Sequence, residues 1–129
     1  MVQTAAPDRV AVEELIQIYC DSWGEPDPAR RRRAVERVWV EDGTYTDPSV
    51  HTSGRDELVA HIGNVLAKYP GARIVRTSAV DVHHGMLRFT WHMVLATGQA
   101  LPDGIDFGEL AGDGKLRRIV GFFGRLAKA

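Results

Sequence analysis

The hydrophobic pattern of this chain changes period after Pro70-Gly71, and this change limits what the chain can fold into. Before that point, apolar residues recur mainly every three or four positions, as they do in amphipathic helices. Beyond it they alternate, and every second residue from Leu87 to Leu95 is apolar, which is typical of a strand with one buried face. A group of helices followed by a group of strands predicts an α+β fold with an antiparallel sheet.

Capping and turn residues divide the chain into its predicted elements. Asp8 is placed to cap the first helix, and Asp27 stands before Pro28 as the cap of the second. Ser53 and Asp56 resemble a capping box for the third. We therefore expect helices over about residues 8–23, 27–39 and 53–69, a turn at 41–43, and strands over residues 44–47, 72–82, 86–97, 105–110 and 115–126.

The length of 129 residues fits a single domain over residues 1–129. The formal net charge is −1, from 16 basic and 17 acidic residues, so the charge balance does not favour nucleic acid or a membrane surface as a partner. The arginines at 30–33 would spread around a helix, and we interpret them as solvated surface. The chain shows no signal peptide and no apolar stretch near the roughly 20 residues of a membrane span, so we expect a cytoplasmic protein.

Cysteine and histidine give no sign of a metal or redox centre. Cys20 is the one cysteine, so no intrachain disulfide can form, and we interpret it as a packing residue. Of the five histidines, His83 and His84 are neighbours that point to opposite sides of an extended chain. We interpret the histidines as turn and surface residues, and we expect no metal and no cofactor.

Three polar residues stand in apolar surroundings and are the candidates for chemistry. Tyr19 lies in the apolar stripe of the first helix, Asp47 ends a short strand, and Asp106 lies between two apolar residues of a later strand. A buried carboxylate is costly unless it is paired or protonated. Each residue also has an ordinary structural interpretation: Asp47 as a turn cap, Tyr19 as a core residue, and Asp106 as a solvent-facing residue if the alternation runs the other way.

The order of elements and several short segments resemble the nuclear transport factor 2-like superfamily, which includes ketosteroid isomerases and SnoaL-type polyketide cyclases. The resemblance spans essentially the whole chain. It implies a cone-shaped α+β barrel in which three N-terminal helices pack on a curled, mostly antiparallel sheet around an apolar pocket. The segments that carry it are Leu-Ile-Gln-Ile-Tyr19, Trp39-Val-Glu-Asp-Gly-Thr-Tyr-Thr-Asp47-Pro48, Gly54-Arg-Asp-Glu-Leu, Phe89-Thr-Trp91, Gly104-Ile-Asp106-Phe, Asp113-Gly-Lys-Leu and Gly121-Phe-Phe-Gly124.

The catalytic pattern implied by this resemblance is similar to that of ketosteroid isomerase. Tyr19 and Asp106 would donate hydrogen bonds to an enolate oxygen, and Asp47 would be the general base. The implied function is acid–base chemistry beside a carbonyl, as in isomerisation or cyclisation, without a cofactor. Trp91 is bulky for a steroid-sized pocket, so the resemblance does not imply a steroid substrate. The alternatives are a non-catalytic module that binds an apolar ligand and an accessory protein that interacts through its outer sheet face.

The resemblance and the alternation together predict the pocket wall and the assembly. Gly121 is expected to leave room for a ligand. The other face of the strand at 86–97 carries Met86, Thr90, His92 and Val94, which is too apolar to be purely solvent-facing, so we expect a homodimer through the outer sheet face. The residues expected to line the pocket around an apolar small-molecule ligand or substrate are Trp23, Trp39, Tyr45, Phe89, Trp91, Met93, Ile119, Gly121 and Phe123.

Overall fold

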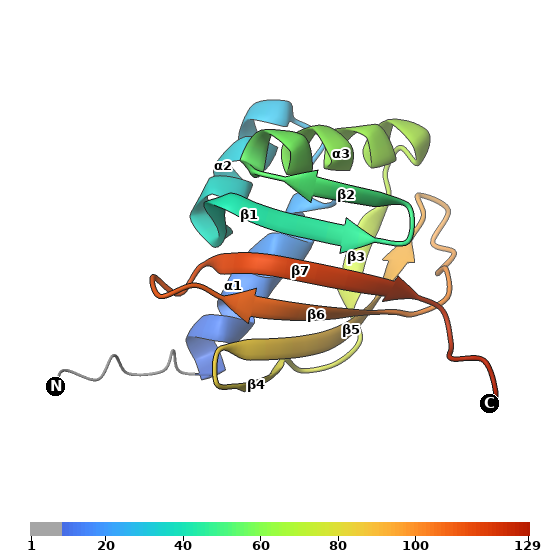
Figure 1. The fold of residues 1–129 in the computed structure, drawn as a ribbon. Helices are drawn as coiled ribbons and strands as arrows, with labels where there is room; N and C mark the ends of the chain where they lie inside the picture. Colours follow the sequence, from blue (N-terminus) through green and yellow to red (C-terminus); the bar gives the residue numbers. More distant parts are fainter. Residues whose placement is uncertain (1–8) are drawn as a thin grey trace, which may run out of the picture.

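The computed structural model describes residues 9–129 as three helices and a curled, unclosed seven-stranded sheet (Figure 1). The α+β class expected from the sequence is confirmed, while the predicted cap Asp8 lies outside the described residues. The helices are α1 (Arg9–Ser22), α2 (Pro28–Val38) and α3 (Arg55–Lys68). The strands are β1 (Trp39–Asp47), β2 (Val50–Ser53), β3 (Arg73–Arg76), β4 (Asp81–His83), β5 (Met86–Val94), β6 (Gly104–Leu110) and β7 (Leu116–Phe123).

The sheet has the strand order β2-β1-β7-β6-β5-β3. β3 and β4 pair with different parts of the same edge of β5: β3 with its C-terminal half and β4 with its first residues. All of these pairs are antiparallel except β1 with β7, which is parallel. Antiparallel neighbours can be joined by short turns, whereas β1 and β7 are far apart in the chain and no hairpin dictates their relative direction. The mostly antiparallel sheet expected from the sequence is therefore confirmed.

The first two helices begin and pack as their sequence indicates. Asp27 caps α2 by accepting a hydrogen bond of 2.9 Å from the backbone N–H of Arg30, and Pro28 follows it at the first helical position. The helix α1 buries Val12, Ile16 and Tyr19, at the spacing of one apolar stripe.

The start of α3 differs from the predicted capping box. Gly54 is the N-cap, with a positive φ of 85° and no side-chain bond to the helix. Asp56 instead forms an ion pair with Arg32, and Glu57 accepts a hydrogen bond of 3.1 Å from the backbone N–H of Ser53. The carboxyl that closes the turn is thus one residue later than expected, because the longer glutamate side chain can reach back to this N–H.

The segment at 39–43 is strand rather than helix end and turn, and the short strand β2 was not anticipated. Trp39 begins β1, is fully buried, and packs its indole ring over the backbone of Gly43. The pairing of β1 with β7 shifts register between Trp39 and Thr44, so this stretch is irregular strand. The Glu-Asp-Gly sequence therefore marks this irregularity instead of a turn.

The long strand expected over residues 72–82 is divided into β3 and β4. Both pair with β5, but residues 77–80 leave the sheet between them. Glu13 of α1 holds this break, because its carboxylate accepts a hydrogen bond of 2.8 Å from the backbone N–H of Val80 and forms an ion pair with Arg76. A contact with a distant helix thus overrides the local strand pattern.

Arg31 is buried, contrary to the interpretation of the arginine run as solvated surface. Its guanidinium donates to the backbone carbonyls of Glu25 (3.0 Å) and Pro26 (3.2 Å). A Cβ atom at Gly63 would lie 2.7 Å from Arg31 Nη1, so the glycine in α3 leaves the space that the guanidinium occupies. Arg31 therefore joins α2 to α3 and to the loop after α1.

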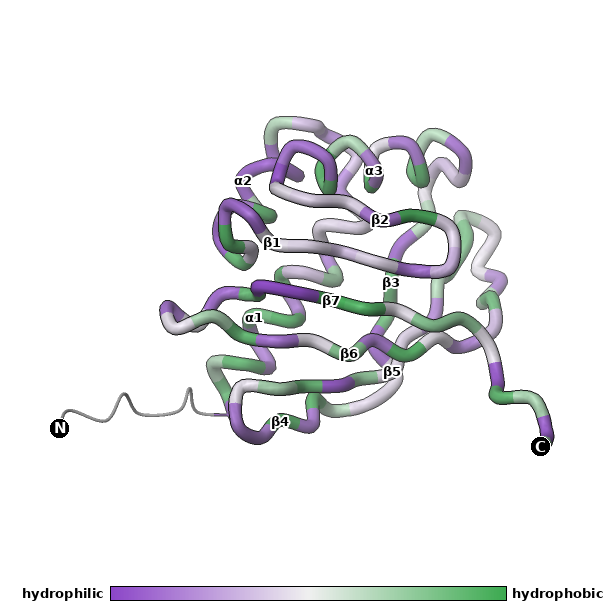
Figure 2. Tube along the Cα trace, in the orientation of Figure 1, coloured by the Kyte–Doolittle hydropathy of each residue, from purple (hydrophilic) through white to green (hydrophobic). Residues whose placement is uncertain are grey.

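The helices cover one face of the sheet and enclose the core there. In Figure 1, α1 passes behind β6 and β7, while α2 and α3 lie beside β1 and β2. In Figure 2, β7 has hydrophilic residues near its start and continues with hydrophobic ones. Burial alternates along β6, where Asp106 is buried and Phe107 is exposed, as expected for a strand with one buried face. No helix within residues 9–129 is long and apolar enough to span a membrane.

The packing of Trp39 on Gly43 predicts the effect of adding one methyl group. A Cβ atom at residue 43 would lie 2.4 Å from Trp39 Nε1, so Gly43→Ala should displace a fully buried ring and lower the free energy of unfolding by about 1–3 kcal/mol. Gly112→Ala is the matched control, because nothing lies within 4 Å of its added carbon. Urea denaturation gives the free energy of unfolding of both variants. An equal loss in Gly43→Ala and Gly112→Ala would contradict the proposed packing of Trp39 on Gly43.

Candidate functional site

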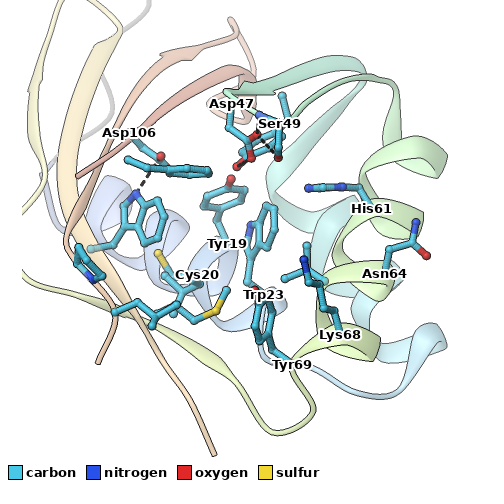
Figure 3. Close-up of a pocket in the computed structure, with 18 of the residues that line it drawn as sticks. Tyr19, Cys20, Trp23, Asp47, Ser49, His61, Asn64, Lys68, Tyr69 and Asp106 are labelled. Carbon is cyan, nitrogen blue, oxygen red and sulfur yellow. Dashed lines mark hydrogen bonds between the residues drawn. The ribbon is translucent and has the colours of Figure 1, made fainter. Parts of the chain in front are cut away.

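A cavity of about 710 Å³ lies between α1, α3 and the inner face of the sheet (Figure 3). Aromatic and aliphatic side chains form most of its wall, and polar groups stand at separate points around it. The lining residues are Tyr19, Cys20, Trp23, Tyr45, Asp47, Ser49, His61, Asn64, Val65, Lys68, Tyr69, Ile74, Trp91, Met93, Leu101, Pro102, Asp106, Phe123 and Gly124.

Asp106 is a buried carboxyl in the wall of this cavity, with 4% of its surface exposed. The alternation in β6 turns Asp106 inward, so the solvent-facing interpretation does not hold. Trp91 Nε1 donates a hydrogen bond of 2.9 Å to Asp106 Oδ1. Burial raises the pKa of Asp106 to about 7, the negative charge of Asp47 acts in the same direction, and the Trp91 donor opposes them. Near neutral pH this carboxyl is therefore present in both protonated and ionised forms.

Gly121 provides the space in which the Asp106 carboxyl lies. The two residues are paired across β6 and β7. A Cβ atom at Gly121 would lie 2.8 Å from Asp106 Oδ1, 3.7 Å from Asp47 Cβ and 3.8 Å from the Tyr45 hydroxyl. Gly121 was expected to leave space for a ligand. In the structure the polar side chains of Asp106, Asp47 and Tyr45 converge on this space instead.

Asp47 is both a turn cap and a member of the cavity wall. Its Oδ1 accepts hydrogen bonds from the backbone N–H of Ser49 (2.7 Å), the Ser49 hydroxyl (2.7 Å) and the backbone N–H of Val50 (3.1 Å). Its Oδ2 accepts one from the Tyr45 hydroxyl at 2.7 Å. The turn interpretation is therefore confirmed, and the turn holds the carboxylate in place so that Oδ2 is the oxygen less occupied by protein donors.

Tyr19 brings a buried hydroxyl that has no hydrogen-bond partner within the described part of the chain. Its ring stacks on Trp39 with centroids 5.7 Å apart, and it meets Trp23 edge-on at 6.4 Å. Burial raises the pKa of Tyr19 well above the ordinary value for tyrosine, and the charge of Asp106 adds to this effect. The phenol therefore stays protonated and can donate.

His61 is a cavity residue that the sequence analysis treated as ordinary surface. Its ring lies 5.7 Å from Trp23 and 6.0 Å from Tyr45, measured between centroids. Burial lowers the pKa of His61, and the nearby negative charge of Asp47 opposes this shift. The signal in the sequence was a second stripe on α3, with His61, Val65 and Lys68 at steps of four and three residues beside the stripe that packs into the core.

The residues expected to line the pocket are divided between the core and the cavity wall, with Gly121 in neither. Trp39, Phe89 and Ile119 are buried in the core and are absent from the cavity wall, because the cavity does not extend down to this layer. Gly121 faces Asp106 through its backbone. The expected residues that do line the cavity are Trp23, Tyr45, Trp91, Met93 and Phe123.

The raised pKa of Asp106 predicts how protein stability depends on pH. Below about pH 3.8 the Asp106 carboxyl is protonated in both the folded and the unfolded protein. As the pH rises from 3.8 towards 7, the carboxyl ionises in the unfolded chain but stays protonated in the folded one, so the free energy of unfolding falls. Asp106→Asn removes the titration. Relative to wild type, its free energy of unfolding should increase as pH rises through this window and level off above it.

The exposed Asp42 supplies the control for this experiment, as Asp42→Asn. Urea denaturation at closely spaced pH values measures all three proteins. A constant difference between wild type and Asp106→Asn from pH 4 to 8 would show that Asp106 titrates normally.

Comparison with known proteins identifies the family. A family model described as SnoaL-like domain matches residues 16–119. A candidate isomerase of the SnoaL-like family from Agrobacterium tumefaciens is 30% identical, with a TM-score of 0.84 over 90% of this chain and 99% of that one. A SnoaL-like protein from Jannaschia sp. CCS1, named as a candidate polyketide cyclase, is 16% identical, with a TM-score of 0.72 over 94% of this chain and 90% of that one. No curated protein gives a significant match. The chain therefore belongs to the SnoaL-like domain family, within the nuclear transport factor 2-like superfamily.

Proposed function

We propose that the cavity is the active site of an enzyme that moves a proton at a carbon next to a carbonyl, in an isomerisation or a cyclisation. The observation that carries this proposal is the buried Asp106 carboxyl, whose pKa is raised to about 7 in the cavity wall. A protonated carboxyl in a dry site is a hydrogen-bond donor for an oxygen that becomes negative during the reaction. The candidate isomerase and cyclase among the structural relatives support the same reaction class.

In the proposed reaction, Asp47 is the base and Asp106 and Tyr19 are donors. Asp47 Oδ2 takes a proton from the carbon next to the carbonyl. The electron pair of that C–H bond moves to the carbonyl oxygen and gives an enolate, which accepts hydrogen bonds from Asp106 and Tyr19. Return of the proton from Asp47 to a different carbon completes an isomerisation. In a cyclisation the enolate carbon instead forms a bond to a second carbonyl carbon, the π electrons of that carbonyl move to its oxygen, and the proton held by Asp47 returns to this alkoxide. The turn donors on Oδ1 of Asp47 keep the base in position.

Substitutions of the two carboxyls test this division of roles. Asp47→Asn removes the base and should abolish turnover. Asp106→Ala removes a donor and should lower kcat by about 10²–10³, whereas Asp106→Asn still donates and should be milder. Activity should also fall as pH rises above about 7, because Asp106 then loses its proton. The measurement is turnover of a panel of enones and β-keto compounds by wild type and variants.

Asp42→Asn, on the exposed part of β1, is the control for changing a carboxylate to an amide, and melting temperatures control for folding. Turnover that Asp47→Asn leaves unchanged would contradict the proposed base. Binding of panel compounds without turnover of any would favour the second candidate, a non-catalytic module for an apolar small molecule. The apolar wall formed by residues such as Trp23, Met93 and Ile74 is the observation that favours that alternative.

We further propose that the protein forms a homodimer through the outer face of the sheet. Phe107 and Phe122 are 41% and 54% exposed and meet edge-on, with ring centroids 6.1 Å apart. Their strand partners Val120 and Ile105 extend this apolar surface across β6 and β7. Ion pairs at its margin, such as Arg117 with Glu109, offer both charge signs, as a surface that meets its own copy requires. The sequence pattern indicated β5 as the centre of this interface. In the structure the exposed aromatic residues lie instead on the neighbouring strands β6 and β7.

Charge in the centre of this face should prevent association. Phe107→Asp and Phe122→Asp are expected to give monomers at micromolar concentration, because each would bury a carboxylate in the interface, while wild type has the mass of a dimer. Val10→Asp, at an exposed position on α1, should remain dimeric. Light scattering after size-exclusion chromatography gives the masses. A wild-type monomer, or dissociation caused equally by Val10→Asp, would rule out this interface.

A further inference from the structure

The charged groups of the cavity are separated along its length. Asp47 and Asp106 come from β1 and β6, and their carboxyls converge near Gly121. Lys68 is the cationic residue among the lining side chains, and it comes from the end of α3. The cavity therefore has an acidic end on the sheet and a basic position on the helix.

Lys68 faces the same side of α3 as His61. The two residues are seven positions apart, which is nearly two helical turns and roughly 10 Å along the axis. In Figure 3 both side chains extend from α3 toward the middle of the cavity, on the side where Trp23 lies. His61 is close enough to Asp47 for the two to interact electrostatically, so Lys68 lies well away from the carboxylate end.

Lys68 is an exposed residue at the margin of the cavity, and its surroundings leave its charge available to a bound molecule. Within residues 9–129 the amino group has no carboxylate partner, and it lies 5.5 Å from the centroid of the Tyr69 ring. The Tyr69 ring adds aromatic surface beside the amino group, and Leu101 and Phe123 belong to the apolar wall of the same cavity. An anion here would gain a charge-assisted hydrogen bond, whereas the same anion beside Asp47 would be repelled.

We propose that the cavity takes an apolar substrate that carries an anionic group, such as a carboxylate, and that Lys68 binds this group while the carbonyl end of the molecule faces Asp106. This inference rests on the proposed function, because it names the substrate class of the same site. The separation of charges sets the direction in which the substrate enters: the anion stays near Lys68 on α3, and the reacting carbon lies beside Asp47 on the sheet. Asn64, one turn from Lys68 on α3, supplies an amide donor at the same margin of the cavity.

The test uses two fluorescent probes that share an aromatic body and differ in charge. Anilinonaphthalene sulfonate carries an anionic group, and N-phenyl-naphthylamine does not. Lys68→Gln should weaken binding of the sulfonate about tenfold and leave the neutral probe within about twofold. Lys68→Arg should restore most of the sulfonate affinity, and Lys128→Gln, an exposed lysine outside the cavity, should change neither probe.

Fluorescence titration of each protein gives the dissociation constants, and only the signal that Val65→Trp removes is assigned to the cavity. Sulfonate binding that Lys68→Gln does not weaken, or an equal loss of both probes, would overturn the anionic subsite. Binding of the neutral probe in the cavity of the wild-type protein would leave the proposed active site standing in both of these cases. Failure of both probes to bind the cavity of the wild-type protein would overturn the anionic subsite, and turnover of the enone and β-keto panel would test the proposed function separately.

Discussion

The pairing of Asp106 with Gly121 across β6 and β7 is the constraint on which the site depends. It turns the Asp106 carboxyl toward the interior, and the missing side chain at Gly121 gives that carboxyl the space it occupies. A shift of one residue in this register would turn Asp106 out to solvent and bring Ile105 or Phe107 inward. Its raised pKa exists only because the strand pairing keeps the carboxyl away from water.

Aromatic packing supplies the dry surroundings that this carboxyl requires. Tyr19 stacks on Trp39, and Trp23 contacts both Tyr19 and Tyr45. These rings join α1 to β1, so the helix and the strand reach the cavity as one packed layer. Trp91 is exceptional among them, because its ring forms part of the wall while its N–H is bonded to Asp106. The bulky residue that argued against a steroid-sized site thus also positions a carboxyl.

The sequence was informative where local patterns and tertiary contacts agree. The helices and the turn chemistry of Asp47 could be predicted, whereas the alternation in β6 left the direction of Asp106 open and only the family resemblance implied an inward carboxyl. The strand character of residues 39–43 could not, because it depends on burial of Trp39 against Tyr19 and Gly43. His61 was missed for a related reason: the stripe that it forms with Val65 and Lys68 on α3 can be assigned to a cavity only when the position of the cavity is known. The buried Arg31 likewise depends on the space left by the distant Gly63.

The parallel pairing of β1 with β7 has a consequence for the order in which the molecule can be assembled. β7 is the final strand of the sheet in chain order, yet it lies between β1 and β6. Until it is in place, the halves of the sheet have two unpaired edges that face each other, and Asp106 lacks the strand that shields it. Such long-range closure is slow, so a nascent chain would have no cavity until synthesis reaches β7, and exposed edges in the interim would favour association with other chains.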